Sequence, residues 1–375
     1  MGPKTKPGRP EAGGLGLLEE AFRPGVPELR KTAFLTAYEI QKHFARDGQQ
    51  RFKFECIVGM GQYGVACRIL EKEQRGFFFR RPERRFIVKV ALGNDPEVVN
   101  ALTHEIEMVQ RLRGSSHVLQ PIKITRNPLL GALKGPSLIA EYIENGPLAD
   151  FLDLALAKKL PLPNRLLWRI FNCLLHFVIA MAWPGRNSVY RGAKKTQIYH
   201  NDMHLGNVLI GDFDSDEHAL APMLKLIDFG LSGESSASRP FMQGANPAVR
   251  QNIFDIGIIM VCLISGRWSP SKASMDMRLY GRSLRIESAA VALASPHHFP
   301  GLDEDLCGLV IWCCASHPEN RPEIENLSNI ITHQLHIKTA AAYVGTLAEA
   351  RETDAAVAEF VRNIMVPGPR PTSSS

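Results

Sequence analysis

The sequence predicts a mixed α+β protein, in which a smaller strand-rich region precedes a larger and mainly helical region. Four apolar runs favour strands, three of them between positions 52 and 92: FKFECIV, GVACRIL, RRFIVKVAL and, at 137–143, SLIAEYI. After Gly146 the apolar positions recur mainly at helical spacing. We therefore expect two lobes with a cleft between them.

Length and composition are those of a globular protein that can bury a large core. The chain has 375 residues, of which 45% are hydrophobic and 22% are charged. Its net charge of +6 is mild, so no nucleic-acid partner is expected. The seven cysteines include no C-x-x-C pair, and we interpret them as reduced, packed thiols rather than zinc ligands.

Two long apolar segments, 166–183 and 253–265, have to be distinguished from membrane spans. Both contain polar or charged residues, so we expect buried helices. The first thirty residues are interrupted by Pro, Gly and charge and do not resemble a signal peptide. These features favour a cytoplasmic or nuclear location and give no indication of oligomeric state.

The expected organisation follows composition along the chain. It comprises a disordered N-terminal tail (1–28), a helical extension (29–53), one domain (54–337) with lobes 54–143 and 144–337, a C-terminal helix (338–365) and a flexible tail (366–375).

A glycine-rich turn, GMGQYGV (59–65), lies between the first two predicted strands. Because Gly59, Gly61 and Gly64 lack side chains, backbone N–H groups of the turn could approach polyphosphate oxygens closely. A dinucleotide site with this spacing leads into a helix, whereas a strand follows in this chain. The turn alone does not exclude an ordinary hairpin.

One lysine, Lys89, stands inside the apolar strand FIVKV. A lysine among aliphatic neighbours is costly to bury without an anionic partner. The helix predicted over 97–113 offers Glu105 and Glu107, and we expect Glu105 to be that partner. An ion pair at the surface is the alternative.

Two polar segments in the helical region carry candidate chemistry: HNDMHLGN (200–207) and IDFG (227–230). Asp202 would accept a hydrogen bond from an attacking hydroxyl group and later take its proton. Asn207 and Asp228 would hold Mg²⁺ beside phosphate groups, since this ion prefers oxygen ligands. Phosphoryl transfer needs mainly positioning and charge neutralisation, and these side chains would supply both.

In their order along the chain, these segments resemble the motifs of the protein-kinase superfamily. The resemblance covers about residues 54–335 and includes GMGQYGVA, FIVKV, Glu105, LIAEYIENGPLADFL, HNDMHLGN, IDFGLS, NIFDIGIIM and HPENRP. It implies a bilobal protein-kinase-like fold with a β-rich N-lobe and a helical C-lobe. It also implies transfer of the γ-phosphoryl group of ATP, with Mg²⁺, to Ser or Thr of a protein substrate.

The resemblance assigns roles residue by residue. It places ATP against Gly59, Gly61, Gly64, Val65, Lys89, Glu141 and Ile143. It assigns catalysis to Asp202 as the base and to Lys89 held by Glu105, and it assigns magnesium binding to Asn207 and Asp228. His204 would add a hydrogen bond to the transferred phosphoryl group.

The loop departs from the usual family pattern at Asn201 and His204, where protein kinases mostly have Arg and Lys. The Arg usually receives a phosphate from the activation segment, so we expect a loop that is placed without phosphorylation. The H-x-D-x-H-x-G-N form resembles small-molecule kinases of the aminoglycoside and choline type, and divergent kinase-like proteins of filamentous fungi. Two alternatives therefore stay open: a small-molecule kinase and a nucleotide-binding pseudokinase scaffold.

Two further departures concern the support of this loop. Asn252 stands where the family has an Asp that braces the loop, and Asp255 in the next turn is an alternative brace. Arg321 lacks the Glu that usually pairs with it, because GANPAV contains none. The acceptor and the regulation of the protein do not follow from the sequence.

Overall fold

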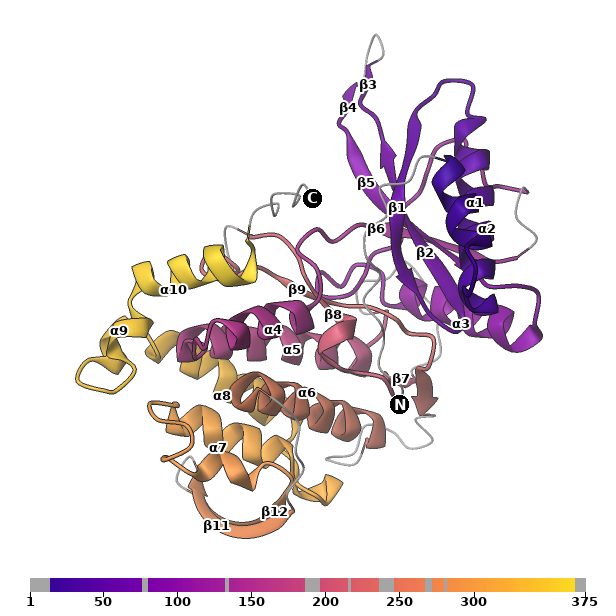
Figure 1. Cartoon of the computed structure of the whole chain (residues 1–375). Helices are drawn as coiled ribbons and strands as arrows, with labels where there is room; N and C mark the ends of the chain where they lie inside the picture. The colour runs from indigo at the N-terminus through magenta and orange to yellow at the C-terminus, as the bar shows by residue number, and fades with distance from the viewer. Residues whose placement is uncertain are drawn as a thin grey trace. The chain divides into compact units, whose positions relative to one another are not determined.

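The computed structural model forms two compact units. The first comprises Met1–Arg113 and Leu119–Tyr142, and the second Gly114–Val118 and Ile143–Ser375. The structure describes residues 14–75, 80–131, 135–185, 196–214, 217–235, 246–266, 272–279 and 282–367. The first unit is rich in β-sheet and the second is mainly helical (Figure 1), which confirms the predicted fold class.

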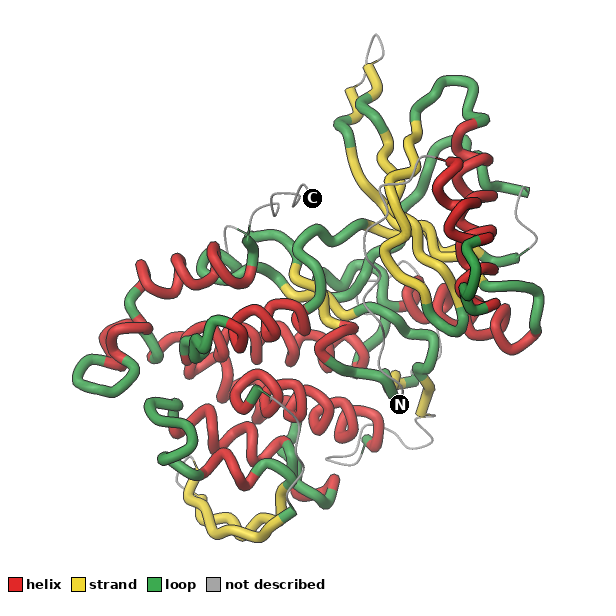
Figure 2. The backbone as a smooth tube through the Cα atoms, in the orientation of Figure 1, coloured by secondary structure: helices red, strands yellow, loops and turns green. Residues whose placement is uncertain are grey.

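A four-stranded antiparallel sheet with strand order β1-β2-β5-β6 lies at the centre of the first unit (Figure 2). Its strands are β1 (Phe52–Met60), β2 (Gly64–Glu71), β5 (Arg84–Ala91) and β6 (Ser137–Glu141). All four coincide with the apolar runs that predicted strands, because β-branched and aromatic side chains pack well on a half-buried sheet. β5 is an inner strand, and it pairs Lys89 with Ala66 and Leu138.

Two helices, α1 (Gly14–Phe22) and α2 (Glu28–Ala45), share one hydrophobic core with this sheet. The ring of Phe44 on α2 meets those of Phe52 and Phe86 edge-on, with centroids 5.0 and 5.9 Å apart. Such edge-to-face packing adds to the hydrophobic gain from burial.

The expectation of disorder over 1–28 was wrong for its second half. Helix α1 buries Leu17 and Ala21, which lie four residues apart and so share one helix face. Contact with α2 provides the apolar surface that this short, Gly-rich segment lacks by itself.

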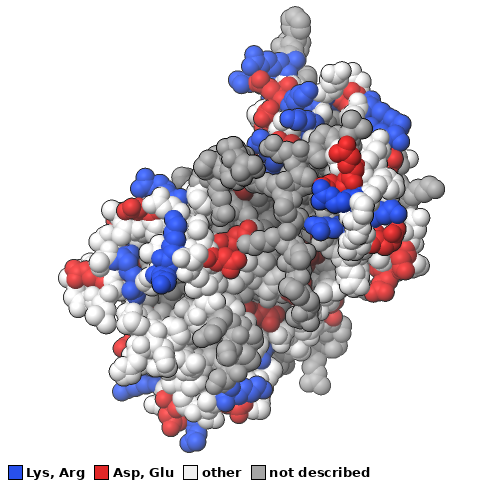
Figure 3. All heavy atoms as spheres, in the orientation of Figure 1, with Lys and Arg blue, Asp and Glu red and all other residues white. Residues whose placement is uncertain are grey.

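Helix α3 (Pro96–Arg111) follows β5 and lies within two residues of the helix predicted over 97–113. The Asp95 side chain caps it by accepting the N–H of Glu97 at 2.8 Å, and Pro96 occupies its first position. The short strands β3 (Gln74–Arg75) and β4 (Arg80–Arg81) pair in a hairpin around which basic side chains gather (Figure 3).

The second unit contains seven α-helices in its described part: α4 (Leu148–Ala157), α5 (Asn164–Ala182), α6 (Pro247–Ser265), α7 (Glu304–Cys313), α8 (Ile324–Ile337), α9 (Glu349–Glu352) and α10 (Asp354–Phe360). Helices α5 and α6 are long and apolar enough to cross a membrane by length and composition. Most of each apolar window is buried against the rest of the fold, 78% in α5 and 61% in α6. Burial of this kind is what a core helix shows.

Short paired strands lie beside the helices of the second unit. β8 (Val208–Ile210) pairs with β9 (Leu224–Leu226), and β7 (Gln197–Tyr199) pairs with β10 (Gly233–Ser235). Together these strands frame the two polar segments of the sequence, HNDMHLGN and IDFG.

A two-stranded ribbon between α6 and α7 is an addition that the sequence analysis did not predict. It consists of β11 (Ala273–Leu279) and β12 (Arg282–Ser288). The buried side chain of Ser288 ties its end to α7 by donating to the carbonyl oxygen of Ile311 at 2.8 Å.

The single helix expected over 338–365 is divided into short pieces. They are a 3-10 turn (Ala340–Tyr343), α9, α10 and a π-helical turn (Val361–Met365). Gly345 interrupts the helical path with φ 77°, a left-handed conformation that favours glycine. The fully buried carboxylate of Glu352 in α9 accepts the N–H groups of Asn164 and Arg165 at the start of α5.

Candidate functional site

The first unit holds the predicted lysine and glutamate pair. Lys89 Nζ on β5 lies 2.7 Å from Glu105 Oε2 on α3, and the Glu105 side chain is 3% exposed. Glu107, the other residue considered from the sequence, is exposed. A buried carboxylate is costly without a cationic partner, so the loss of this ion pair should destabilise the first unit.

The glycine-rich turn joins β1 to β2 in the same unit. Gly61 N–H donates to the Gly64 carbonyl at 2.9 Å and closes the turn. A Cβ at Gly64 would lie 3.0 Å from the carbonyl oxygen of Val90, next to Lys89 on β5, so a larger residue would push the two strands apart. A Cβ at Gly61 would meet no atom of the described residues within 4 Å, so packing against those residues does not require that glycine.

The predicted adenine-contacting residues fall in different units. Glu141 ends β6 in the first unit, where its backbone N–H donates to the Gln120 carbonyl at 3.0 Å. Its side chain accepts the Gln120 N–H at 2.8 Å. Ile143 begins the main segment of the second unit and is buried.

The second unit brings Asp202 and Asn207 together in the loop after β7. The Asn207 amide Nδ2 donates to the backbone oxygen of Asp202 at 2.9 Å and to its Oδ2 at 3.1 Å. The amide oxygen of Asn207 is consequently turned away from Asp202. About a third of the Asp202 side chain remains exposed.

His204 is oriented by the same loop. Its Nδ1 accepts the N–H of Gly206 at 3.0 Å, so in the neutral ring the proton resides on Nε2, which lies 3.6 Å from Asp202 Oδ2. A Cβ at Gly206 would lie 2.8 Å from His204 Cε1, so only glycine fits against the ring. The imidazole therefore faces the carboxylate of Asp202 in this arrangement.

A buried histidine, His200, joins the loop to the IDFG segment. Its Nε2 lies 3.1 Å from the Ile227 carbonyl oxygen, and Ile227 N–H donates to the Asn207 carbonyl at 3.0 Å. Burial lowers the pKa of His200 to about 4, while the nearby carboxylates of Asp228 and Asp202 act in the opposite direction. These bonds hold the backbone before Asp228 next to Asn207, and Asp228 itself has a left-handed φ of 68°.

Asn252 on α6 supports the loop, at the position where the motif resemblance leads one to expect an Asp. Its Oδ1 accepts the His200 N–H at 3.2 Å, and its Nδ2 donates to the Ile198 carbonyl at 2.8 Å. Asp255 does not substitute for it. Its carboxylate accepts a hydrogen bond from Gln251 at 2.8 Å, and burial raises its pKa to about 6.

Arg321, expected to lack a partner, uses other groups. It donates to the carbonyl oxygens of Ala315 and Arg250, each at 2.9 Å, and its guanidinium lies 4.5 Å from the centroid of the Phe254 ring. Arg250 in turn pairs with Glu323. The guanidinium is thus satisfied by backbone oxygens instead of a carboxylate.

One group with ligand chemistry was missed by the sequence analysis. His117, Cys173 and His218 lie together in the second unit, although they are scattered along the sequence. The available signal was Cys173-x-x-His176 within a predicted helix, a spacing that puts both side chains on one face. The absence of C-x-x-C pairs, on which the interpretation of the cysteines as packed thiols depended, says nothing about a Cys-x-x-His spacing.

Comparison with known proteins relates about 70% of the chain to kinases. No family model matches the chain. The RasGEF domain-containing serine/threonine-protein kinase X of Dictyostelium discoideum is 23% identical over 282 residues, 68% of this chain and 25% of that protein. Receptor-interacting serine/threonine-protein kinase 3 is 25% identical in both Homo sapiens (72% of this chain, 49% of that protein) and Rattus norvegicus (67% and 52%).

This chain spans about half the length of the receptor-interacting kinases and a quarter of the Dictyostelium protein. Each of these relatives is named a serine/threonine-protein kinase. The similarities are distant, and they relate this chain to protein-kinase-like proteins.

Proposed function

We propose that this chain is an ATP- and Mg²⁺-dependent protein kinase that phosphorylates Ser or Thr residues. The observation that carries the proposal is the linked group of Asp202, Asn207 and Asp228. Asn207 contacts Asp202 directly, and the backbone before Asp228 is bonded to both Asn207 and His200. A group of two carboxylates and an amide is well suited to accept a proton and to bind a hard cation.

Asp202 would act as the proton acceptor in this proposal. Its carboxylate is partly exposed and is oriented by the amide of Asn207, so a substrate hydroxyl could reach it. Asp202 would orient the hydroxyl by accepting its hydrogen bond and would receive its proton as the new bond to phosphorus forms.

Asn207 and Asp228 would hold Mg²⁺. The donor set fits this ion, since Asn207 has its amide nitrogen committed to Asp202 and therefore presents oxygen on its other side. When bound, Mg²⁺ would neutralise charge on the phosphate oxygens. His204, whose Nε2 faces Asp202, would modulate that carboxylate rather than replace the usual lysine charge.

In the first unit, Lys89 would contact the α- and β-phosphates of ATP while Glu105 fixes its position. The turn of Gly59, Gly61 and Gly64 would cover the phosphates, and Gly61 fits this role because no atom of the described residues lies within 4 Å of the position that its Cβ would take. Val65, Glu141 and Ile143 would contact the nucleoside.

A protein acceptor is favoured by the relatives, each named a serine/threonine-protein kinase. The experiment is to incubate the purified chain with labelled ATP and Mg²⁺, with either generic protein substrates or small alcohols. Asp202→Asn should lower transfer to protein by about 10³-fold. The matched control is Asp212→Asn, an exposed aspartate in the same unit, which should leave the rate unchanged.

The other outcomes separate the alternatives. Transfer to small alcohols alone would replace the proposal by a small-molecule kinase, the class that His204 in this loop resembles. Binding of ATP without transfer to any acceptor would identify a nucleotide-binding scaffold. Equal transfer by wild type and Asp202→Asn would overturn the assignment of the catalytic base.

A further inference from the structure

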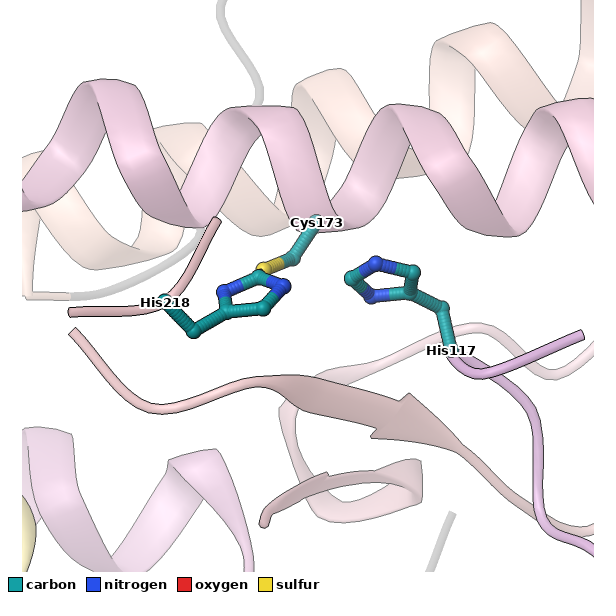
Figure 4. A group of neighbouring side chains, drawn as sticks. All are labelled: His117, Cys173 and His218. Atoms are coloured by element: carbon teal, nitrogen blue, oxygen red, sulfur yellow. The ribbon is translucent and has the colours of Figure 1, made fainter. Parts of the chain in front are cut away.

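Three side chains with metal-ligand chemistry meet in the core of the second unit, away from the sequence motifs described above. His117 precedes the β-bridge of Val118 to Leu226, Cys173 lies in α5, and His218 lies between β8 and β9. One ring nitrogen of each histidine and the Cys173 sulfur all lie within 4.8 Å of one another. All three residues are less than 5% exposed, and their side chains converge beneath α5 (Figure 4).

The hydrogen bonding of His117 leaves one ring nitrogen free to bind a cation. Its Nδ1 lies 3.1 Å from the Leu224 carbonyl oxygen, which can only accept, so Nδ1 carries the proton and Nε2 keeps its lone pair. Burial lowers the pKa of His117 to about 3, so the ring is neutral at physiological pH. A neutral imidazole that donates its other N–H to a backbone carbonyl is the usual form of a metal-bound histidine.

His218 supplies an independent indication of a missing partner. Its Nε2 is buried and has no hydrogen-bond partner among the described residues, while its Nδ1 lies 3.9 Å from Cys173 Sγ. In Figure 4 the rings of His218 and His117 lie side by side beneath the helix, and the Cys173 side chain points from the helix toward His218. Leaving a buried nitrogen without a partner costs about 1–3 kcal/mol, and a cation in this position would remove that cost.

A fourth ligand is close. His176 lies one turn after Cys173 on α5, and its ring stacks on His117 with centroids 4.7 Å apart and planes 14° apart. His117 and His176 also form a second possible ligand group with Glu217. His117 belongs to both ligand groups. A tilt of the His176 ring would therefore bring a fourth donor atom to the group of His117, Cys173 and His218.

We propose that His117, Cys173 and His218, with His176 as fourth ligand, form a structural site for Zn²⁺ or a similar borderline-soft divalent cation. One sulfur and three imidazole nitrogens suit such an ion and do not suit Mg²⁺ or Ca²⁺, which prefer oxygen. The site would join α5 to the segment that follows α3 and to the loop between β8 and β9. It does not depend on the proposed phosphotransfer.

Binding would displace one proton. Burial raises the pKa of the Cys173 thiol to about 12, so the thiol is protonated without an ion. The metal–sulfur bond forms as the thiol proton leaves to solvent, and a divalent ion with one thiolate and three neutral imidazoles carries a net charge of +1. Glu217 lies close enough to act electrostatically on His176 and His218 and would partly offset that charge, whereas Arg169 and Lys225 oppose it.

The test uses the full chain, stripped with a chelator and titrated with Co²⁺ as a spectroscopic substitute for Zn²⁺. Wild type should bind one equivalent and develop intense tetrahedral d–d bands and a thiolate-to-cobalt charge-transfer band, and addition of Zn²⁺ should abolish both. Cys173→Ser should lose the charge-transfer band, and His218→Gln should weaken Co²⁺ binding by about 100-fold or more.

The matched control is Cys307→Ser, which removes another buried cysteine of the same unit and should keep the full cobalt spectrum. Circular dichroism establishes that each variant is folded. If a variant fails to fold, competition of wild type with a chromophoric chelator measures Zn²⁺ affinity instead. A wild-type chain without tetrahedral bands, or a charge-transfer band that persists in Cys173→Ser, would overturn the proposal.

Discussion

Two groups of polar side chains flank the same strand of the second unit, and they differ in chemistry. At one end of β9, His117 is hydrogen-bonded to Leu224 and lies beside a sulfur and further imidazoles. Just beyond the other end, His200 is hydrogen-bonded to Ile227 and lies near the carboxylates of Asp202 and Asp228. The nitrogen and sulfur group suits borderline-soft cations and the oxygen group suits hard ones, so one strand positions two different ligand sets.

The two groups also differ in access to solvent. The side chains of Asp202 and His204 are 32% and 42% exposed, whereas His117, Cys173 and His218 are almost fully buried. An exposed group can exchange substrate and product on every turnover. A buried group is suited to a resident ion, because its ligands are held by the core and water is excluded.

The largest effects are expected from two substitutions, one in each group of side chains, with phosphate transfer and the cobalt spectrum measured for both variants. Asp228→Asn should lower Mg²⁺-dependent phosphate transfer by about 10²–10³-fold and leave the cobalt spectrum unchanged, because it removes a charged ligand from the oxygen group only. Cys173→Ser should abolish the charge-transfer band and keep the transfer rate. A loss of transfer of equal size in folded Cys173→Ser would show that the two groups are not independent.

Acid should destabilise the fold through the buried histidine of each group. The folded-state pKa values of His117 (about 3) and His200 (about 4) lie below the ordinary value of about 6.5, so the unfolded chain binds protons more readily. This stabilisation is present above pH 6.5 and is lost progressively as the pH falls from 6.5 toward the folded-state values of about 3 and 4. Between pH 7 and pH 5 each histidine should cost about 2 kcal/mol of unfolding free energy.

Urea unfolding at pH 7 and pH 5, with a chelator present, measures this loss. His117→Asn and His200→Gln should each reduce it by about 2 kcal/mol, because neither amide titrates in that range. The control is His298→Gln, an exposed histidine whose removal should leave the pH dependence unchanged. If wild type, His117→Asn, His200→Gln and His298→Gln all lose the same unfolding free energy between pH 7 and pH 5, the buried histidines are not the cause of the acid sensitivity.

A smaller effect is expected from substitution of Asn252, which supports the loop of Asp202 and is not hydrogen-bonded to the group of His117, Cys173 and His218. Asn252→Ala removes the acceptor for His200 N–H and the donor to Ile198 O, both buried, and should lower the unfolding free energy by about 1–3 kcal/mol. Transfer activity should fall with it, because the loop that carries Asp202 loses its brace. Asn252→Asp should restore part of the unfolding free energy and part of the transfer activity, because its carboxylate can again accept the His200 N–H.

Denaturant unfolding and transfer rates measure these changes, with Asn326→Ala on the exposed face of α8 as control. Cobalt binding should be unchanged in all three variants. Loss of cobalt binding in folded Asn252→Ala would mean that the brace supports both ends of β9.

The sequence by itself determined the elements whose pattern is local. The four strands of the first sheet, α2 and α3 follow from the period of their apolar residues, and the spacing of the polar segments indicated Asp202, Asn207 and Asp228 as one group. The partner of Lys89 also followed, because a charge inside an apolar strand needs a counter-charge and the next helix offers Glu105.

Only the tertiary structure decided the features that depend on distant contacts. It gave α1 a partner helix, paired β11 with β12, assigned the bracing role to Asn252 rather than Asp255, and brought His117, Cys173 and His218 together. The physical reason is that periodicity reports which face of an element is buried and not what it is buried against. Cys173 and His176 share a helical spacing, but His117 and His218 come from segments far apart in the sequence, so no local pattern relates them to that helix.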